Sequence, residues 1–150
     1  MKTIARTLLP LMLLSSSAFA KDLVNVAGAS NIAISGYDPV AFFTDGKPAH
    51  GSPFISAMHR GATYFFASEE HKKMFTSNPD RYVPQYGGFC AYGVGYDGLY
   101  PVDISTWQIR NDKLYLNFSP ETANKFNSNF DANVAKAEKY WPGLVQKNEK

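Results

Sequence analysis

Residues 63–90 constrain the fold more than any other part of the chain, because they hold a strand, a helix start and a helix stop in close succession. Residues 62–67 are rich in Tyr and Phe, as expected of a half-buried strand. Ser68 predicts a helix N-cap, and the acidic pair Glu69-Glu70 favours the positive end of the helix dipole. Asn78-Pro79 predicts the end of that helix.

Residues 53–67 have the alternation of a β-hairpin, and Arg60-Gly61 supplies its turn. On the helix that follows, His71, Met74 and Phe75 are spaced three and four residues apart, so they share one face. We expect that face to meet the hairpin.

A second hairpin is predicted over residues 107–118, with its turn at Asn111-Asp112. Ser119-Pro120 then predicts the start of a long amphipathic helix, since apolar residues recur at threes and fours as far as Trp141. Residues 127–129 are a candidate break in this helix. Pro142-Gly143 predicts its end, because proline cannot continue the backbone hydrogen bonding.

Together these segments predict an α+β fold, in which two β-hairpins form a small antiparallel sheet. The sheet is expected to pack against a short central helix, residues 68–77, and the long C-terminal amphipathic helix. A single domain over residues 36–145 is expected, preceded by an extended lead-in over residues 21–35 and followed by a frayed tail over residues 146–150.

The first 20 residues have the pattern of a cleavable signal peptide. Lys2 and Arg6 are basic, residues 8–14 form a short apolar stretch, and residues 18–20 read Ala-Phe-Ala, a typical cleavage site. The apolar stretch is shorter than a membrane span requires. We therefore expect cleavage after Ala20, a periplasmic or secreted protein, and no membrane span in the mature chain.

The charge of the mature chain is balanced. Without Lys2 and Arg6, the 15 basic residues fall to 13, which equals the 13 acidic residues. Nucleic-acid binding would call for a basic patch or stripe. We expect no nucleic-acid partner.

Cys90 is the only cysteine, so it cannot form an internal disulfide. In an exported protein it is a buried thiol, a metal ligand, an intermolecular partner or a reactive group. The sequence leaves these four alternatives open.

Several motifs in order resemble those of the YHS domain family, particularly its small exported bacterial members. They are residues 36–43 (GYDPVAFF), residues 64–75 (YFFASEEHKKMF), residues 78–91 (NPDRYVPQYGGFCA) and residues 114–118 (LYLNF). The resemblance implies a compact hairpin-and-helix unit and a transition-metal site, usually suggested to hold copper. Of the positions implied as metal ligands, His71 matches, whereas Ala41 and Ala67 stand where cysteines are usual.

The first functional hypothesis is therefore an exported, non-enzymatic YHS-type module that binds Cu(I) or Zn(II). Its candidate ligands are His71 and Cys90, with Met74 or Met58 as a soft third donor, because sulfur ligands favour Cu(I). His50 and His59, near the first hairpin, are further candidate donors.

Two alternatives use the same segments differently. Cys90 and His71 could form the thiol and base of a thiol-dependent enzyme, in which the imidazole activates the sulfur. Otherwise the glycine-rich and aromatic residues 86–100 could line a pocket for a small apolar or aromatic ligand, or form a surface for a protein partner, without any metal.

Overall fold

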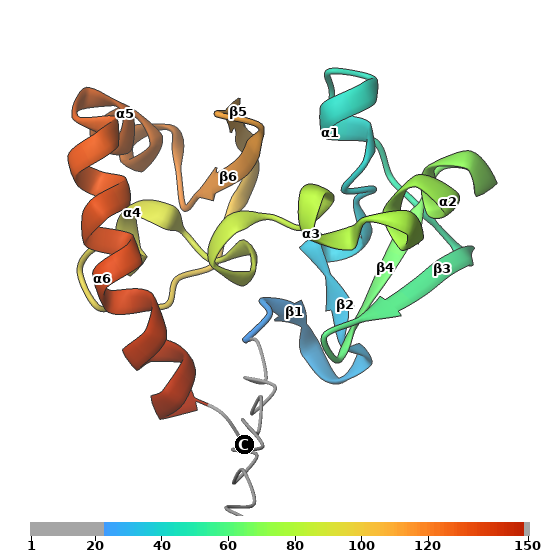
Figure 1. Ribbon diagram of the computed structural model, residues 1–150, viewed down its shortest axis with the longest axis horizontal. Helices are drawn as coiled ribbons and strands as arrows, with labels where there is room; N and C mark the ends of the chain where they lie inside the picture. Colours follow the sequence, from blue (N-terminus) through green and yellow to red (C-terminus); the bar gives the residue numbers. More distant parts are fainter. Residues whose placement is uncertain (1–22, 149–150) are drawn as a thin grey trace, which may run out of the picture.

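The structure, a computed structural model, describes residues 23–148, so the predicted signal peptide lies outside the described residues. The chain forms two lobes joined at Pro84, a first lobe of residues 23–83 and a second lobe of residues 85–148 (Figure 1). The first lobe contains strands β1 (Val26–Ala27), β2 (Ile32–Ala33), β3 (Ser52–His59) and β4 (Ala62–Phe66), and helices α1 (Ala41–Thr44), α2 (Glu69–Ser77) and α3 (Pro79–Tyr82). The second contains α4 (Ala91–Val94), β5 (Asp103–Arg110), β6 (Lys113–Asn117), α5 (Pro120–Ser128) and α6 (Phe130–Asn148).

The mixed α+β class is confirmed, and both predicted hairpins are present. Strands β3 and β4 pair antiparallel around Arg60 and Gly61, which both have positive φ. Strands β5 and β6 do the same around Asn111 and Asp112. Positive φ at both turn residues matches the right-handed twist of the flanking strands.

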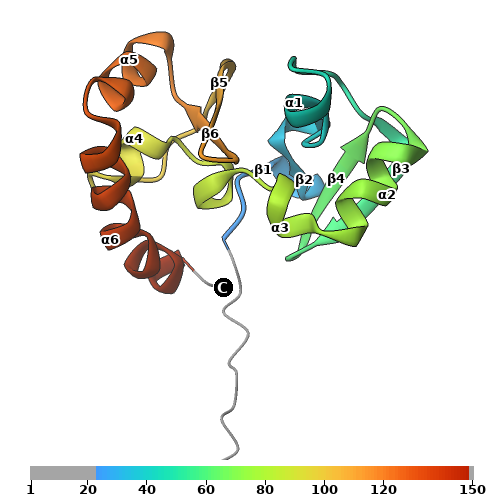
Figure 2. The same ribbon diagram turned by 45° about the horizontal axis from the view of Figure 1, so that its top comes forward.

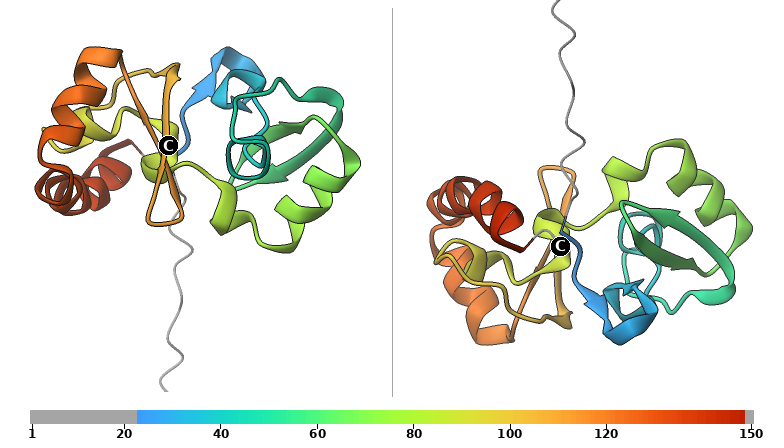
Figure 3. Two further views of the ribbon diagram at one scale, coloured as in Figure 1. Left: turned by 90° about the horizontal axis from the view of Figure 1, so that it is seen from above. Right: turned by 90° about the horizontal axis from the view of Figure 1, so that it is seen from below.

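The expectation of one antiparallel sheet is corrected, because the two hairpins lie in separate sheets. The first hairpin belongs to a four-stranded sheet in the order β1-β2-β4-β3, and the second forms a two-stranded sheet of its own. Figures 2 and 3 show the second hairpin beside the first lobe rather than continuing its sheet.

The two hairpins lie in separate sheets because strand β6, in the second hairpin, is buried on both faces. Leu116 belongs to the apolar core of the first lobe, together with Tyr64, Phe66 and Phe75. The neighbouring Tyr115 points the other way, as alternate residues of a strand do, and belongs to the core of the second lobe. The second hairpin is therefore a wall shared by two cores.

Residues 23–35 are more than an extended lead-in. Strand β2 pairs parallel with β4 through Ile32 and Thr63, and β1 pairs antiparallel with β2. Ala33 and Ile34 are buried in the first core. Each of these strands has only two residues, which is too short for an alternating pattern to be visible in the sequence.

The helix starts are confirmed. The side chain of Ser68 accepts a hydrogen bond of 3.1 Å from the backbone N–H of His71. Ser119 and Thr122 form a capping box at the start of α5. The candidate break is also present, since α5 ends before Asn129 and α6 begins at Phe130.

The predicted end at Pro142-Gly143 is wrong, because α6 continues to Asn148. A proline inside a helix removes one hydrogen bond and costs about 3 kcal/mol. Leu144 and Val145 lie beyond the proline and are 4% and 8% exposed. Burial of two such side chains stabilises the last turn by a comparable amount, roughly 1.5–3 kcal/mol each. Residues 146–148 are consequently helical rather than a frayed tail.

Within residues 23–148, none of the helices combines the length and the apolar character needed to cross a membrane.

Candidate functional site

His71 is bound to Asp38 rather than to Cys90. Its Nδ1 donates to Asp38 Oδ2 across 2.6 Å. Its Nε2 lies 3.3 Å from the hydroxyl of Thr44 and 3.6 Å from a carboxylate oxygen of Asp45. Both ring nitrogens thus face groups of the first lobe. The helix α2 holds the ring in this position through the Ser68 cap.

The carboxylate of Asp38 is fully buried and accepts four hydrogen bonds. Besides His71, its donors are the backbone N–H groups of Val40 at 2.8 Å, Ala41 at 3.4 Å and Ala67 at 2.8 Å. A buried carboxylate is stable when hydrogen bonds of this kind satisfy its oxygens. Asp38 therefore ties α1 and the end of β4 to α2.

Three positions implied as metal ligands by the family resemblance converge on this carboxylate. They are Ala41, Ala67 and His71, and each bonds to Asp38. The two alanines supply only backbone N–H groups, which are hydrogen-bond donors and not metal ligands. At this point the chain presents one imidazole and carboxylate oxygens, which is not the sulfur-rich set that Cu(I) favours.

Cys90 lies in the second lobe at the start of α4. Its side chain is 2% exposed, and its Sγ accepts the backbone N–H of Gly93 at 3.4 Å. The thiol also donates to Asn117 Oδ1 at 3.7 Å. That oxygen is identified as an acceptor by the N–H of Tyr92, which bonds to it at 3.1 Å. The arrangement suits a protonated thiol.

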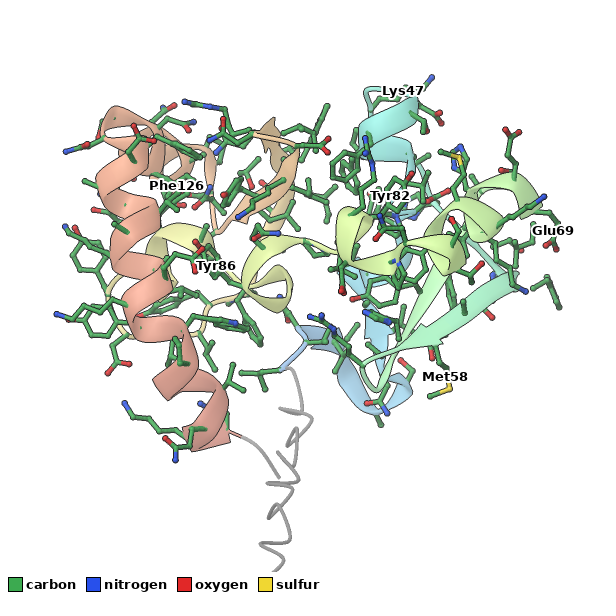
Figure 4. All side chains as sticks on the ribbon, in the orientation of Figure 1. Lys47, Met58, Glu69, Tyr82, Tyr86 and Phe126 are labelled. Carbon is green, nitrogen blue, oxygen red and sulfur yellow. The ribbon has the colours of Figure 1, made fainter. Side chains whose placement is uncertain are left out.

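The remaining candidate donors are dispersed. Met74 packs against the first core, and Met58 is 77% exposed on β3. Figure 4 shows the Met58 side chain directed away from the body of the lobe. His50 stacks on Tyr37 with ring centroids 4.0 Å apart, and His59 lies 3.4 Å from Asp80.

No group of three or more His, Cys, Asp or Glu side chains within residues 23–148 is arranged to hold a metal ion. The residues present do not fit the metal site that the resemblance implies. The hypothesis of metal binding through His71, Cys90, Met74 and Met58 is left for a titration to test.

An apolar cavity of about 350 Å³ is lined in part by Cys90. Three aromatic side chains at its mouth are unusually exposed, Tyr96 by 57%, Tyr100 by 52% and Phe118 by 53%. We call this cavity the aromatic pocket; its lining residues are Cys90, Tyr92, Gly93, Tyr96, Tyr100, Phe118 and Thr122.

Glycines shape one wall of the aromatic pocket. A Cβ atom at Gly93 or at Gly98 would lie 2.4 Å from the ring of Tyr100, closer than side-chain carbons approach. The absence of side chains at these two positions lets the Tyr100 ring lie close to the backbone. The sequence predicted such a pocket from residues 86–100. It missed Phe118 and Thr122, which come from the end of β6 and from α5.

A pair of tyrosine hydroxyls lies at the pocket wall. Tyr92 donates to the oxygen of Tyr96 at 3.3 Å, which raises the pKa of Tyr92 and lowers the pKa of Tyr96. The ammonium group of Lys136, 3.5 Å from the Tyr96 oxygen, lowers the pKa of Tyr96 further. The polar ends of these rings are therefore engaged with each other.

Asn117 lies behind the thiol and is fully buried. Its Oδ1 accepts two hydrogen bonds, whereas its Nδ2 has no hydrogen-bond partner among the residues that the structure describes. An unpaired buried amide donor costs roughly 1–3 kcal/mol. The region around Cys90 thus contains an unsatisfied buried hydrogen-bond donor, whereas both carboxylate oxygens of Asp38 are hydrogen-bonded.

Comparison of the chain with protein-family models, with curated proteins and with solved structures found no match in any of the three.

Proposed function

We propose that the protein is an exported, non-enzymatic module of the YHS type that binds a small apolar or aromatic ligand in the aromatic pocket. The observation that carries this proposal is the exposure of Tyr96, Tyr100 and Phe118 around one apolar cavity. Exposed aromatic rings that gather at one concave place are typical of a binding site, whereas exposed apolar residues that are scattered singly over a surface are ordinary.

The shape of the pocket supports a small, flat ligand. A cavity of about 350 Å³ lies at the lower end of the range for small-molecule sites. Its walls are mainly rings, which bind other rings in stacked or edge-to-face arrangements. The hydroxyls of Tyr92 and Tyr96 bond to each other, so they are less available to a polar ligand.

The geometry favours binding over thiol catalysis. A nucleophilic cysteine needs a base within hydrogen-bond distance. Both nitrogens of His71 face Asp38, Thr44 and Asp45 instead, and the Cys90 thiol donates to the Asn117 amide oxygen. In this arrangement the sulfur is a weakly polar part of the pocket wall.

The proposal is tested by titrating the purified protein with indole, phenol and naphthalene, followed by NMR chemical shifts. We expect saturable shifts at Tyr96, Tyr100 and Phe118. Phe118→Ala should weaken binding about tenfold, because one ring contact is worth roughly 1–1.5 kcal/mol.

Phe54→Ala is the matched control, since Phe54 is also an exposed phenylalanine, 93% exposed on β3 and outside the pocket. It should leave binding unchanged. Shifts that do not saturate, or equal losses in the two variants, would overturn the proposal. Rapid labelling of Cys90 by iodoacetamide in the native protein, faster than that of a free thiol, would favour the enzyme alternative instead.

A further inference from the structure

A second cavity, of about 300 Å³, lies between the two lobes. Its walls come from the β3–β4 turn and α3 on one side and from α6 on the other, with the connecting segment after Pro84 between them. We call it the polar cleft. Figure 4 shows Tyr86, one of its lining residues, between α6 and the first lobe.

The charges in the polar cleft are partly paired. Arg60 lies 2.7 Å from Asp80, so these two opposite charges offset each other. Glu138 is hydrogen-bonded by the hydroxyl of Tyr86 at 3.4 Å, and no ion pair to Glu138 is found within residues 23–148. The carboxylate of Glu138 therefore brings a negative charge to the wall of the cleft. Phosphates and carboxylates are disfavoured there, because a like charge repels them.

The cleft also presents an aromatic surface. Trp141 is only half-buried and contacts the ring of Tyr86 edge-on, with centroids 5.9 Å apart. Beside it, Gln85 brings a carboxamide that has both donor and acceptor atoms. No hydrogen bond from the Gln85 side chain is found in the described part of the chain. An indole ring and a carboxamide thus line the same cleft.

We propose that the polar cleft binds a neutral monosaccharide. A sugar ring has an apolar C–H face, which can stack on the indole of Trp141, and a rim of hydroxyl groups. These hydroxyls can donate to the carboxylates of Asp80 and Glu138 and accept from the amide of Gln85. The volume of the cleft, at the lower limit for small-molecule sites, suits one ring.

The sugar site is independent of the aromatic pocket. Its lining residues are different, and its lining is polar where the pocket is apolar. Failure of the one proposal would leave the other in place, since Phe118→Ala should not alter sugar binding and Gln85→Ala should not alter indole binding.

The test uses the fluorescence of Trp141. The chain has two tryptophans, so Trp107→Phe leaves Trp141 as the only indole reporter. The probes are D-glucose, D-galactose, D-mannose and N-acetyl-D-glucosamine. We expect at least one of them to produce a saturable change in the millimolar range. The indole N–H signal of Trp141 in the unaltered protein gives a second measurement, should Trp107→Phe fold poorly.

Two pairs of variants make the test specific. Gln85→Ala and Glu138→Ala should each weaken sugar binding by about fivefold or more, since each removes a hydrogen-bonding group. Gln146→Ala and Glu121→Ala remove the same side chains elsewhere on the surface and should have no effect. The absence of saturation with all four sugars would overturn the proposal. So would saturation that Gln85→Ala and Glu138→Ala leave unchanged, or saturation with tetramethylammonium but not with the sugars, which would indicate a cation site.

Discussion

Each lobe completely buries one polar side chain that joins separate segments of the chain, Asp38 in the first lobe and Asn117 in the second. Asp38 receives four hydrogen bonds and uses both of its oxygens. Asn117 uses its side-chain oxygen for two bonds, and its amide nitrogen has no partner among residues 23–148. We call Asp38 with its donors the first cluster, and Asn117 with Cys90 and Tyr92 the second. The hydrogen-bonding groups of the Asp38 side chain are all paired, whereas the amide nitrogen of Asn117 is not paired with any described residue.

The aromatic side chains near the two clusters also differ in their exposure to solvent. Around Asp38 the aromatic side chains Phe42, Phe66 and Phe75 are fully buried. Beyond Asn117 and Cys90, the rings of Tyr96, Tyr100 and Phe118 are more than half exposed. Unsatisfied polar groups and exposed rings persist where a structure serves binding rather than stability. We therefore expect the first cluster to matter mainly for stability, and the second to support the proposed ligand site.

The largest expected effect is that of Asp38→Ala on stability. The substitution leaves backbone donors and His71 without their acceptor inside the first lobe, so we expect a loss of about 4 kcal/mol in the free energy of unfolding. Urea denaturation followed by circular dichroism measures it. Asp45→Ala, which alters a partly exposed carboxylate near the same histidine, should cost under about 1 kcal/mol. Equal losses in the two variants would break the comparison.

Asn117→Ala should cost less, about 2 kcal/mol in the same measurement. The substitution removes one acceptor for the Tyr92 N–H and the weak thiol contact, but it also removes the unpaired amide donor. A loss as large as that of Asp38→Ala would mean that the second cluster is as important for stability as the first.

Alkaline pH should destabilise the folded protein through Tyr86. Burial, and then the negative charge of Glu138, raise the pKa of Tyr86 above the ordinary value. In the folded state the phenol therefore keeps its proton at a pH where the unfolded chain loses it. The contribution of Tyr86 to the free energy of unfolding is fully present below about pH 10 and decreases as the pH rises above that value. The decrease should be less than about 1.4 kcal/mol per pH unit, because the ring borders an open cleft.

Denaturation of the protein and of Tyr86→Phe at neutral pH and near the upper limit of the alkaline range gives the measurement. Tyr86→Phe loses the bond to Glu138 at neutral pH, worth about 1 kcal/mol. It should then lose stability less steeply than the unaltered protein at high pH. Parallel slopes for the two proteins would show that Tyr86 does not control the alkaline transition. Tyr140→Phe, which alters a more exposed tyrosine on α6, serves as the control.

The smallest effect is expected for metal binding. Titration with Cu(I) and Zn(II) should give no binding tighter than micromolar, because the candidate donors His71, Cys90, Met74 and Met58 are bound or directed elsewhere. Any weaker binding should be unchanged in His71→Ala and Cys90→Ala. Tight binding that both substitutions abolish would restore the metal hypothesis and change the interpretation of both clusters.

The sequence predicted the features that depend on neighbouring residues. Ser68 and Ser119 were identified as helix caps, and the two hairpin turns were placed correctly, since these signals act within a few positions. His71 was identified as important, but its partner was not. Asp38 entered only as part of the motif of residues 36–43, and its bond to His71, 33 positions away, has no local signal.

The same limit applies to the pairing of strands and to the pocket. Nothing near Ile32 indicates that it pairs with Thr63, and nothing near Phe118 indicates that it lines the same cavity as Tyr100. Burial of β6 on both faces could have been suspected from residues 114–118, where apolar and aromatic residues do not alternate with charged ones. Contacts between distant segments depend on the assembled fold, which a pattern in one window does not contain.

The shared wall formed by β6 has a consequence for how the protein is made. The sheet and helices of the first lobe are complete in sequence at Val83, but its core also needs Leu116, with Trp107 packed against it. A chain emerging from the ribosome therefore cannot close that core until more than 30 further residues have followed. We expect the two lobes to unfold as one cooperative unit, and a chain cut at Pro84 to leave two pieces that are each missing one side of their interior.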